Sequence, residues 1–487
     1  MTGELLADYP QSRFYDELIG ADGAPRAAGG RLHKLLTGLS GAELKERHDV
    51  AQRSFRNHGI TFTVYQDDRG IEKIFPFDLV PRVFTARTWQ NLEAGLRQRV
   101  QALNHFLDDV YGERRILRDG AVPAEVVLSS KLFRRELCGF PFPHGLHCHV
   151  SGIDLVRDGQ GEFRVLEDNL RTPSGVSYML ANRQVLKRVF PELFAGYRVR
   201  PIESYSQQLL TNLIWLARER VDHPVVGILT PGIYNAAYFE HVYLAKQMGV
   251  ELVEGSDLLV DRDRVFMRTT GGLQQIHVLY RRIDDEWLDP LHGRHDSILG
   301  TPGLLNAYRA GGIIIANAPG NGVADDKAVY PYVPAMIRYY LGEEPILPNV
   351  QTYVCAVEKD RRYVLEHLPD LVIKSVGESG GYGMLIGPTA SRSDLERVRG
   401  RIQADPRGYI AQPVVDISVQ PTFDGRALSP RHQDLRPFVL MGERITVTPG
   451  GLTRVALRPG SLVVNSSQGG GSRDTWVLAA EGEEAES

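Results

Sequence analysis

The chain has 487 residues, of which 43% are hydrophobic and 24% are charged, with a formal net charge of -4. This length is too great for one ordinary core and predicts about three domains. The slightly acidic balance argues against nucleic acid held by bulk positive charge, and no apolar run approaches the roughly 20 residues that cross a bilayer. The three cysteines form no disulfide framework and the first residues resemble no signal peptide, so we expect a cytoplasmic protein with no nucleic-acid or membrane partner.

Residues 1–125 are predicted to wrap the surface and then to become helical. Residues 1 to about 40 are rich in glycine and alanine, and residues 41 to 125 look mainly helical. Residues 89–111 carry apolar side chains at helical spacing, which predicts a helix with one face on the core. These side chains are Leu92, Leu96, Val100, Leu103, Phe106, Leu107 and Val110.

A β-hairpin is predicted around the turn at residues 158–161, Asp-Gly-Gln-Gly. If the two strands close symmetrically on this turn, Arg157 lies opposite Glu162, and Asp154 lies opposite Val165. Opposed residues share a face, and each strand alternates with a period of two. The register is therefore decisive, since a slip of one residue moves every side chain to the other face.

This hairpin directs Asp154, Glu167 and Asn169 to one face and Asp168 to the other. Two carboxylates and an amide oxygen suit a hard cation such as Mg²⁺, which takes a few oxygen ligands together with phosphate. The alternative is a surface hairpin whose exposed face happens to be acidic.

The segment that follows favours the metal site. Residues 170–175, Leu-Arg-Thr-Pro-Ser-Gly, set an arginine, two hydroxyls and a glycine directly after the strand. Arg171 and Ser174 provide a suitable lining for phosphate or carboxylate oxygens. Helices are expected from about Tyr178 and over residues 205–222.

Residues 223–322 alternate strand and helix patterns, which predicts a small α/β domain with a parallel sheet. Arg281, Arg282 and Asp284 are candidates for binding a second substrate, although a salt-bridged strand end explains them equally well. The strands are expected at residues 223–229, 250–253, 278–283 and 312–317, and a helix at 239–248.

From about residue 325 the pattern changes to a helix and several short strands, before an acidic tail at 481–487. The helix is expected at residues 335–341, and the strands at 371–374, 384–386, 409–412, 437–441 and 462–465.

A glycine-rich loop joins the first two of these strands. The first strand ends at Lys374 and Ser375, and glycines allow backbone N–H groups to approach phosphate oxygens closely. No GKS or GKT is present and no helix follows at once, so the loop resembles a lid over a nucleotide more than a Walker A loop. A loose hairpin is the alternative. The loop contains Gly380, Gly381, Tyr382 and Gly383.

Four further side chains are candidates for a nucleotide site. Lys327 opens a helical stretch, where a solvated charge is also expected. Gln412 ends a strand where backbone groups could meet an adenine edge. Arg436 and Arg454 lie within strand patterns, where arginines are usually half-exposed and solvated. Several of them beside Lys374 instead indicate phosphate charge to be neutralised.

A histidine cluster, His144, His147, Cys148 and His149, contains residue types that bind zinc. A strand over residues 146–150 would place His147 and His149 on one face. No second ligand pair stands at a recognisable spacing, so partly buried, hydrogen-bonded histidines are the favoured interpretation.

Several long motifs resemble the circularly permuted ATP-grasp proteins of type 2. They are LEDNLRTPSGVSYMLANR, VIKSVGESGGYGMLIGP, DLRPFVL and GGLTRVALRPGSLVVNSSQGGGSRDTWVL, with FPFDLVPR nearer the start. The resemblance runs from about residue 15 to about 478. It implies an α+β and α/β fold, a circularly permuted ATP-grasp core with an additional small α/β (Rossmann-like) domain and a helical N-terminal region. The expected segments are 1–125, 126–222 with the hairpin, 223–322, 323–480 with the lid, and the tail 481–487.

The resemblance implies a ligase that uses ATP and Mg²⁺ to join a small-molecule or peptide carboxylate to an amine, through an acylphosphate, with release of ADP and phosphate. It also implies an "alpha-E" domain protein as a partner. Two alternatives remain: a catalytically weak nucleotide-binding scaffold, and a kinase that stops after phosphoryl transfer. The related glutathionylspermidine synthetase domain has an arginine two residues before its metal-binding aspartate, where this chain has Gly152.

The resemblance further implies a role for each candidate. Metal is assigned to Asp154, Glu167 and Asn169, and ATP phosphates to Lys327 and Lys374, with Ser375 beside them. Gly380, Gly381, Tyr382 and Gly383 form the lid, and Gln412 lies at the adenine hinge. Arg454, Arg436 and Arg171 stabilise phosphate or acylphosphate, and the substrate carboxylate is expected near Arg171 and Ser174.

Overall fold

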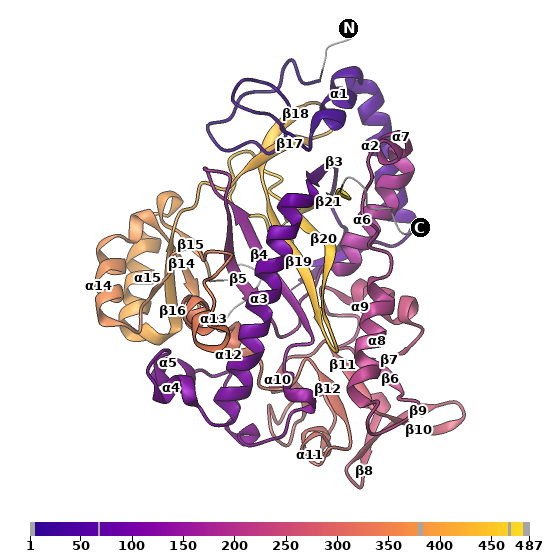
Figure 1. Cartoon of the computed structure of the whole chain (residues 1–487), viewed down its shortest axis with the longest axis vertical. Coiled ribbons are helices and arrows are strands. Elements are labelled where there is room, and N and C mark those ends of the chain that lie inside the picture. Colours follow the sequence, from indigo (N-terminus) through magenta and orange to yellow (C-terminus); the bar gives the residue numbers. More distant parts are fainter. Residues whose placement is uncertain (1–4, 67–68, 378–382, 466–468, 481–487) are drawn as a thin grey trace.

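The structure is a computed structural model that describes residues 5–66, 69–377, 383–465 and 469–480. A six-stranded sheet runs through its centre, with helices on both sides and smaller sheets beside it (Figure 1). The strand order is β3-β21-β20-β19-β4-β5, and every neighbouring pair is antiparallel except β3 with β21. The bounds are β3 Phe77–Phe84, β4 Val150–Arg157, β5 Phe163–Asn169, β19 Asp434–Met441, β20 Ile445–Val455 and β21 Gly471–Val477.

Two helices cover the two faces of this sheet. Helix α3 (Ala86–Tyr111) packs with Leu435 and Val439 of β19 in one core, and α6 (Val176–Val189) packs with Phe438 and Leu440 in the other. The helix predicted over residues 89–111 is confirmed, since all seven of its periodic apolar side chains are buried. Alternating strand residues therefore divide between two cores, which fixes the face on which each polar side chain lies.

The N-terminal region contains more strand than the sequence predicts. Helices α1 and α2 are followed by a two-stranded hairpin and by β3, so a mainly helical interpretation of residues 41 to 125 was wrong for residues 61–84. Strand β3 is buried on both faces, and such a strand lacks the alternation that identifies a half-buried one. The bounds are α1 Gly30–Gly38, α2 Gly41–Asn57, β1 Thr61–Gln66, β2 Arg69–Ile74, α4 Arg115–Arg118 and α5 Ala124–Leu128.

The hairpin β4–β5 forms as predicted, but its register differs. Arg157 lies opposite Phe163, one residue out of the symmetric pairing, which alone would exchange the two faces. Leu166 then forms a bulge, after which Asp154 lies opposite Glu167. The bulge restores the predicted face for the second half of the hairpin.

A four-stranded parallel sheet, in the order β12-β11-β6-β7, confirms the strand and helix pattern predicted after residue 223. A separate antiparallel sheet, β10-β9-β8, lies between β7 and β11 in the sequence and was not expected. The strand bounds are β6 Val226–Leu229, β7 Glu251–Val253, β8 Leu258–Asp261, β9 Arg264–Thr269, β10 Gly272–Ile276, β11 Val278–Arg281 and β12 Ile314–Ala316. The helix bounds are α7 Pro191–Gly196, α8 Tyr205–Ala217, α9 Tyr238–Met248, α10 Asp285–Leu288 and α11 Leu304–Arg309.

A second four-stranded sheet, β13-β16-β14-β15, has its own small core with helices α14 and α15. It lies on the opposite side of the central sheet from α6 and α9 (Figure 1). The strand predicted at residues 462–465 does not form, and this segment has no regular secondary structure. The bounds are α12 Gly322–Asp325, α13 Val333–Leu341, β13 Tyr353–Val354, α14 Glu358–Glu366, β14 Leu371–Ser375, β15 Leu385–Ile386, α15 Arg392–Ala404, β16 Tyr409–Pro413, β17 Val419–Phe423 and β18 Leu428–His432.

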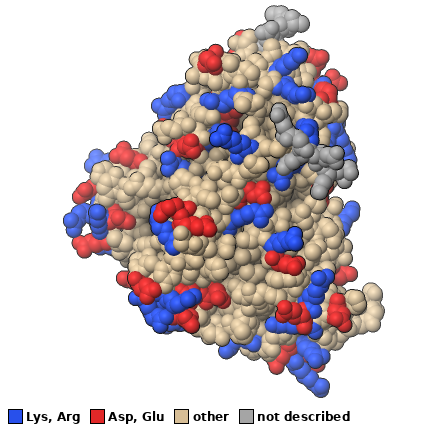
Figure 2. Space-filling model, viewed as in Figure 1, with Lys and Arg blue, Asp and Glu red and all other residues tan. Residues whose placement is uncertain are grey.

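Basic and acidic side chains are interspersed on the face of the molecule shown in Figure 2. This surface matches the small net charge of the sequence. Among the described residues, no helix is both long enough and apolar enough to cross a membrane.

Candidate functional site

The polar face of the hairpin is the centre of the candidate site. Asp154 on β4 lies directly opposite Glu167 on β5, and Asn169 follows two residues later on the same face. Asp168 points to the other face, where both its oxygens accept hydrogen bonds from Arg99 of α3, at 2.6 and 2.7 Å. The predicted separation of these four side chains between two faces is confirmed.

Asp154 is fully buried between two arginines. Arg436 donates from Nε and Nη2 to its two oxygens, at 2.6 and 2.8 Å, and Arg454 donates to Oδ2 at 2.6 Å. Burial alone would raise the pKa of Asp154, but the two guanidinium groups lower it below its ordinary value. A carboxylate offers about four lone-pair sites, and these arginines use three of those of Asp154, whose side chain is fully buried.

The arginines themselves are held by the central sheet. Arg454 of β20 also contacts the buried carboxylate of Asp434 on β19, from Nε at 3.0 Å and from Nη2. Burial raises the pKa of Asp434 in spite of this arginine. Arg436 runs over Gly152, where an added Cβ would lie 3.1 Å from Arg436 Cδ. Gly152 stands where the related synthetase domain has an arginine. In this chain the glycine leaves room for Arg436 from the neighbouring strand β19.

Two lysines approach Glu167 from another part of the chain. Lys327 Nζ, just after α12, lies 3.7 Å from Glu167 Oε2. Burial lowers the pKa of Lys374 on β14 to about 8, against the attraction of Glu167, and the positive charge of Lys327 adds to the lowering. Lys327 thus approaches the hairpin face, and the charge of Glu167 acts on Lys374. The phosphate role of both lysines stays a prediction.

Gln412 is buried on β16, opposite Val372 of β14. Its amide donates to Thr352 Oγ1 at 2.9 Å and to the carbonyl of Leu166, in the hairpin bulge, at 3.5 Å. It therefore lies where the smaller sheet meets the hairpin, and its adenine role stays a prediction. Ser375 ends β14.

The predicted lid lies largely outside the described residues, which omit Gly380, Gly381 and Tyr382. Gly383 is described, with a φ of 69° that favours glycine.

A cleft of about 270 Å³ opens beside the hairpin face. Its polar wall contains Glu167, Asn169 and the three predicted arginines, Arg171, Arg436 and Arg454. Among the residues that the structure describes, the buried Nδ2 donor of Asn169 has no hydrogen-bond partner. Phe62, Phe75 and Tyr178 give the cleft an aromatic wall, and residues 235–237 also line it.

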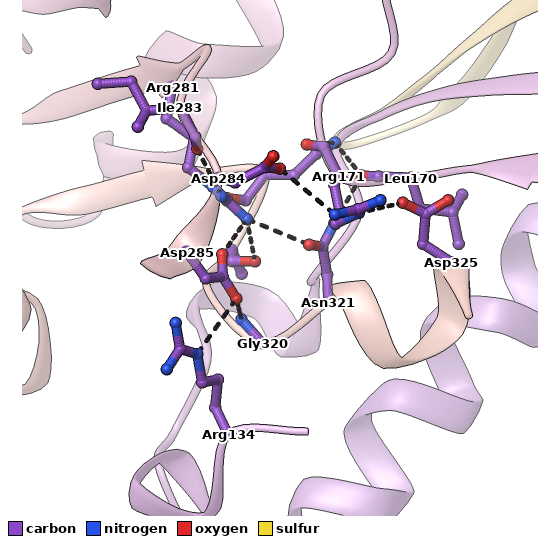
Figure 3. A network of polar contacts seen from close by, with 12 residues as sticks. Arg134, Leu170, Arg171, Arg281, Ile283, Asp284, Asp285, Gly320, Asn321 and Asp325 are labelled. Atoms are coloured by element: carbon purple, nitrogen blue, oxygen red, sulfur yellow. Dashed lines mark hydrogen bonds and ion pairs between the residues drawn. The ribbon is translucent and has the colours of Figure 1, made fainter. Parts of the chain in front are cut away.

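Arg171 is clamped at the edge of this cleft by two aspartates (Figure 3). Its Nε donates to Asp325 at the end of α12, and its Nη1 lies 3.6 Å from Asp284 after β11. Asp325 and then Asp284 raise the pKa of Arg171, even though burial opposes them. A single arginine therefore links the hairpin segment to the parallel sheet.

Arg281 and Arg282 are buried and bonded within the protein. Arg281 contacts Asp285 at 2.7 Å and several backbone carbonyls, as Figure 3 shows in part. Arg282 donates to Ser174 Oγ at 2.6 Å and to Glu240 at 3.0 Å. These contacts support the salt-bridged interpretation of the two arginines, which hold the 173–177 loop and the end of the sheet. Substrate contact stays a prediction for Ser174 and Asp284, which line the cleft.

The histidine cluster does not form the predicted strand, since β4 begins only at Val150. His147 and His149 are buried, and among the described residues their ring nitrogens have no hydrogen-bond partner, contrary to the prediction of hydrogen-bonded rings. His147 Nε2 does lie 3.8 Å from Asp108 Oδ1. Burial lowers the pKa of both, to about 3 for His149, so both rings are neutral at pH 7. Among the described residues, no group of three or more His, Cys, Asp or Glu is arranged to hold a metal.

The model of the circularly permuted ATP-grasp type 2 family matches residues 81–456. The chain belongs to this family. The order of its parts agrees, since the β4–β5 hairpin of this ATP-grasp protein precedes Lys327 and Lys374 in the sequence. Membership implies the use of ATP.

Relatives and a solved structure agree with this assignment. A protein of Synechocystis sp. with the name "Uncharacterized protein" is 54% identical over 97% of this ATP-grasp chain and 98% of its own length. A Frankia alni protein named "Putative glutamate–cysteine ligase 2-3" is 44% identical over 97% of this chain, which spans only 55% of that longer protein. A glutathione synthetase-like effector from Globodera pallida, at 12% identity, shares the fold, with a TM-score of 0.59 over 90% of this chain and 98% of the other. The predicted ATP-grasp fold is confirmed.

Proposed function

We propose that this ATP-grasp protein is a carboxylate–amine ligase that forms an amide bond and releases ADP and phosphate. The observation that carries the proposal is the convergence of Glu167 and Asn169 with Lys327 and Lys374. Carboxylate and amide oxygens for a cation thus lie beside two ammonium groups for phosphates, which is the equipment of phosphoryl transfer.

The residues present fit Mg²⁺ and ATP. Glu167 is partly exposed, Asn169 shares its face and lines the cleft, and Asp154 lies directly opposite Glu167, so we assign the oxygens of these three side chains to the metal. When bound, Mg²⁺ would neutralise charge on the transferring phosphoryl group. Lys374 and Lys327 are assigned to the phosphates.

The chemistry proceeds in two steps. A carboxylate oxygen of the substrate attacks the γ-phosphorus of ATP, the bond to the β-phosphate oxygen breaks, and ADP leaves. The amine then attacks the acyl carbon, phosphate leaves, and the nitrogen loses a proton to give the amide. Arg171, Arg436 and Arg454 line the cleft and orient the carboxylate and the acylphosphate.

The printed name of the Frankia alni protein supports carboxylate–amine ligation, although that protein is nearly twice as long as this chain. A product assay tests the proposal. The full chain is incubated with Mg²⁺, ATP and metabolites extracted from cells, and the products are identified by mass spectrometry. ADP with a new amide is expected. AMP as the main nucleotide product refutes the scheme, ADP with a phosphorylated product and no amide favours a kinase, and no turnover with any extract favours the scaffold.

The metal face has a sharper test in Glu167→Gln. The loss of this carboxylate should abolish Mg²⁺-dependent ATP turnover and leave thermal unfolding nearly unchanged, because the side chain is partly exposed. Glu162→Gln, at an exposed position of the same hairpin, is the matched control and should keep full activity. Equal activity of the two variants would remove the hairpin from the site.

A further inference from the structure

The cleft beside the hairpin continues into a larger groove on the surface. This outer groove of about 930 Å³ shares Asn235 and Ala236 with the cleft of about 270 Å³. It lies between the start of the β1–β2 hairpin and helix α9. A molecule that enters the cleft past Asn235 therefore extends naturally into the outer groove.

The loop at the junction, residues 230–237, exposes two large apolar side chains in succession. Ile233 is 63% exposed and Tyr234 is 83% exposed. Two side-chain hydrogen bonds hold the loop, since Thr230 Oγ1 accepts from the backbone N–H of Gly232 and Asn235 Oδ1 accepts from the backbone N–H of Ala237. Val242 of α9 adds a third exposed apolar side chain to the groove. Apolar surface grouped around a groove is typical of a binding site.

The topology of the parallel sheet places this loop at a ligand-binding edge. In the strand order β12-β11-β6-β7, β6 lies between β7 and β11. The chain runs from β6 to β7 on one side of β6, and later reaches β11 on the other side. Ligands of open α/β sheets bind at the carboxyl ends of the strands where the order reverses in this way. The segments that follow β6 and β11 contribute Asn235 and Asp284 to the cleft.

The charge and shape of the cleft indicate which end of the ligand it holds. Three arginines line the cleft together with three carboxylates, so a guanidinium group can hold a ligand carboxylate while the aromatic wall favours an apolar side chain next to it. The arginines are Arg171, Arg436 and Arg454, and the carboxylates are those of Glu167, Asp284 and Asp325. In that wall Phe75 and Tyr178 stack with ring centroids 4.2 Å apart. The outer groove has mixed charges, with Glu72 and Lys246, so apolar contact dominates there.

We infer that the carboxylate substrate is an extended peptide, whose C-terminal carboxylate and apolar last side chain occupy the cleft while the preceding residues lie in the outer groove against Ile233 and Tyr234. This inference rests on the proposed ligase function and names its substrate class. The activated group is then the C-terminal carboxylate: its oxygen forms the bond to the γ-phosphorus, and ADP carries away the electrons of the broken bond.

A trapping assay tests the inference without knowledge of the amine. The full chain is given Mg²⁺, ATP and hydroxylamine, whose nitrogen attacks the acylphosphate carbon, expels phosphate and leaves a stable hydroxamate. The carboxylates are a mixed N-acetylated pentapeptide library and a matched mixture of N-acetylated amino acids. We expect hydroxamates mainly from pentapeptides with apolar C-terminal residues, with a KM about tenfold or more below that of the amino acids.

Variants of the loop separate the inference from the proposed function. Tyr234→Ser and Ile233→Ser should each raise the KM for the pentapeptides by about five- to tenfold, with kcat and the KM for ATP unchanged. Ile298→Ser, which removes a side chain 88% exposed and absent from the groove, is the control. If amino acids and pentapeptides react equally and both loop variants behave as the control, the inference is overturned and the ligase function stands. If no carboxylate yields ADP and hydroxamate, the ligase function fails, and the inference with it.

Discussion

The two sides of the candidate site balance their charges in different ways. On the hairpin side, Arg436 and Arg454 are paired with the buried carboxylates Asp154 and Asp434, within the largest sheet of the molecule. On the other side, burial lowers the pKa of Lys374 to about 8, because Glu167 only partly compensates for it. The first arrangement makes the charges part of the folded core. The second leaves the positive charge of Lys374 only partly neutralised, as a binding site for an anion requires.

The largest expected effect tests the structural role of the hairpin side. Arg454→Met leaves Asp154 and Asp434 buried with one guanidinium fewer, and an uncompensated buried charge costs about 3–5 kcal/mol. We expect the free energy of unfolding in urea to fall by this amount. Arg458→Met, at an exposed position just after β20, should change it little. If both variants unfold alike, the buried network does not stabilise the fold.

Lys374→Met tests the opposite side and should leave the fold intact. Loss of a charge-assisted hydrogen bond to phosphate should weaken ATP binding by about 1.5–3 kcal/mol, measured by calorimetry. Removing this partly buried charge should not lower the free energy of unfolding. Lys359→Met, at an exposed position of α14, is the matched control. A Lys374→Met variant that unfolds as readily as Arg454→Met would contradict the contrast between the two sides.

Much of the hairpin side could be predicted from the sequence, because it depends on local alternation. The turn, the two strands and the common face of Asp154, Glu167 and Asn169 follow from spacing alone. The correct face was nevertheless predicted through a wrong register, since no pattern in the sequence announced the bulge at Leu166.

The pairing of Asp154 with Arg436 and Arg454 could not be predicted in the same way. It requires β19 to lie beside β4, although the residues are about 280 positions apart in the chain. Residues 235–237 reach the cleft for a similar reason, as their position depends on how the parallel sheet packs on the hairpin segment. A buried strand such as β3 carries no alternation, and the coil at 462–465 has a strand-like composition without strand pairing.

The pH dependence of nucleotide binding sharpens the comparison further. The pKa of Lys374 is lowered to about 8 by burial, from an ordinary value of about 10.4. The ammonium is therefore charged at pH 7 and loses its proton above pH 8, while bound phosphates favour the charged form. We expect the affinity for ADP at fixed Mg²⁺ to fall by about tenfold between pH 7 and pH 9.

Folding responds to the same group with the opposite sign. Between about pH 8 and pH 10.4 the unfolded chain binds more protons at Lys374 than the folded chain, so the contribution of this lysine to stability rises with pH.

Calorimetric titrations of ADP at pH 7 and pH 9, with Lys374→Met beside the parent, measure the effect on binding. The variant should lose most of the dependence, and a parent affinity that stays constant over this range would place the titration elsewhere.

The smallest expected effect concerns the fit of Arg436 over Gly152. A methyl group at this position would lie 3.0 Å from Pro173 Cβ and 3.1 Å from Arg436 Cδ, closer than ordinary contact. The arginine can move more easily than the proline ring, so Gly152→Ala should shift Arg436 and weaken one of its two bonds to Asp154. We expect about 1 kcal/mol of destabilisation, at the low end for overpacking, with a severalfold loss of kcat for ATP turnover. Gly159→Ala, in the turn of the same hairpin, meets its nearest neighbour at an ordinary 3.5 Å and is the control. If the two variants do not differ in urea midpoint or in kcat, Arg436 adapts to the added methyl group without cost. The hairpin side is then less rigid than its buried ion pairs imply.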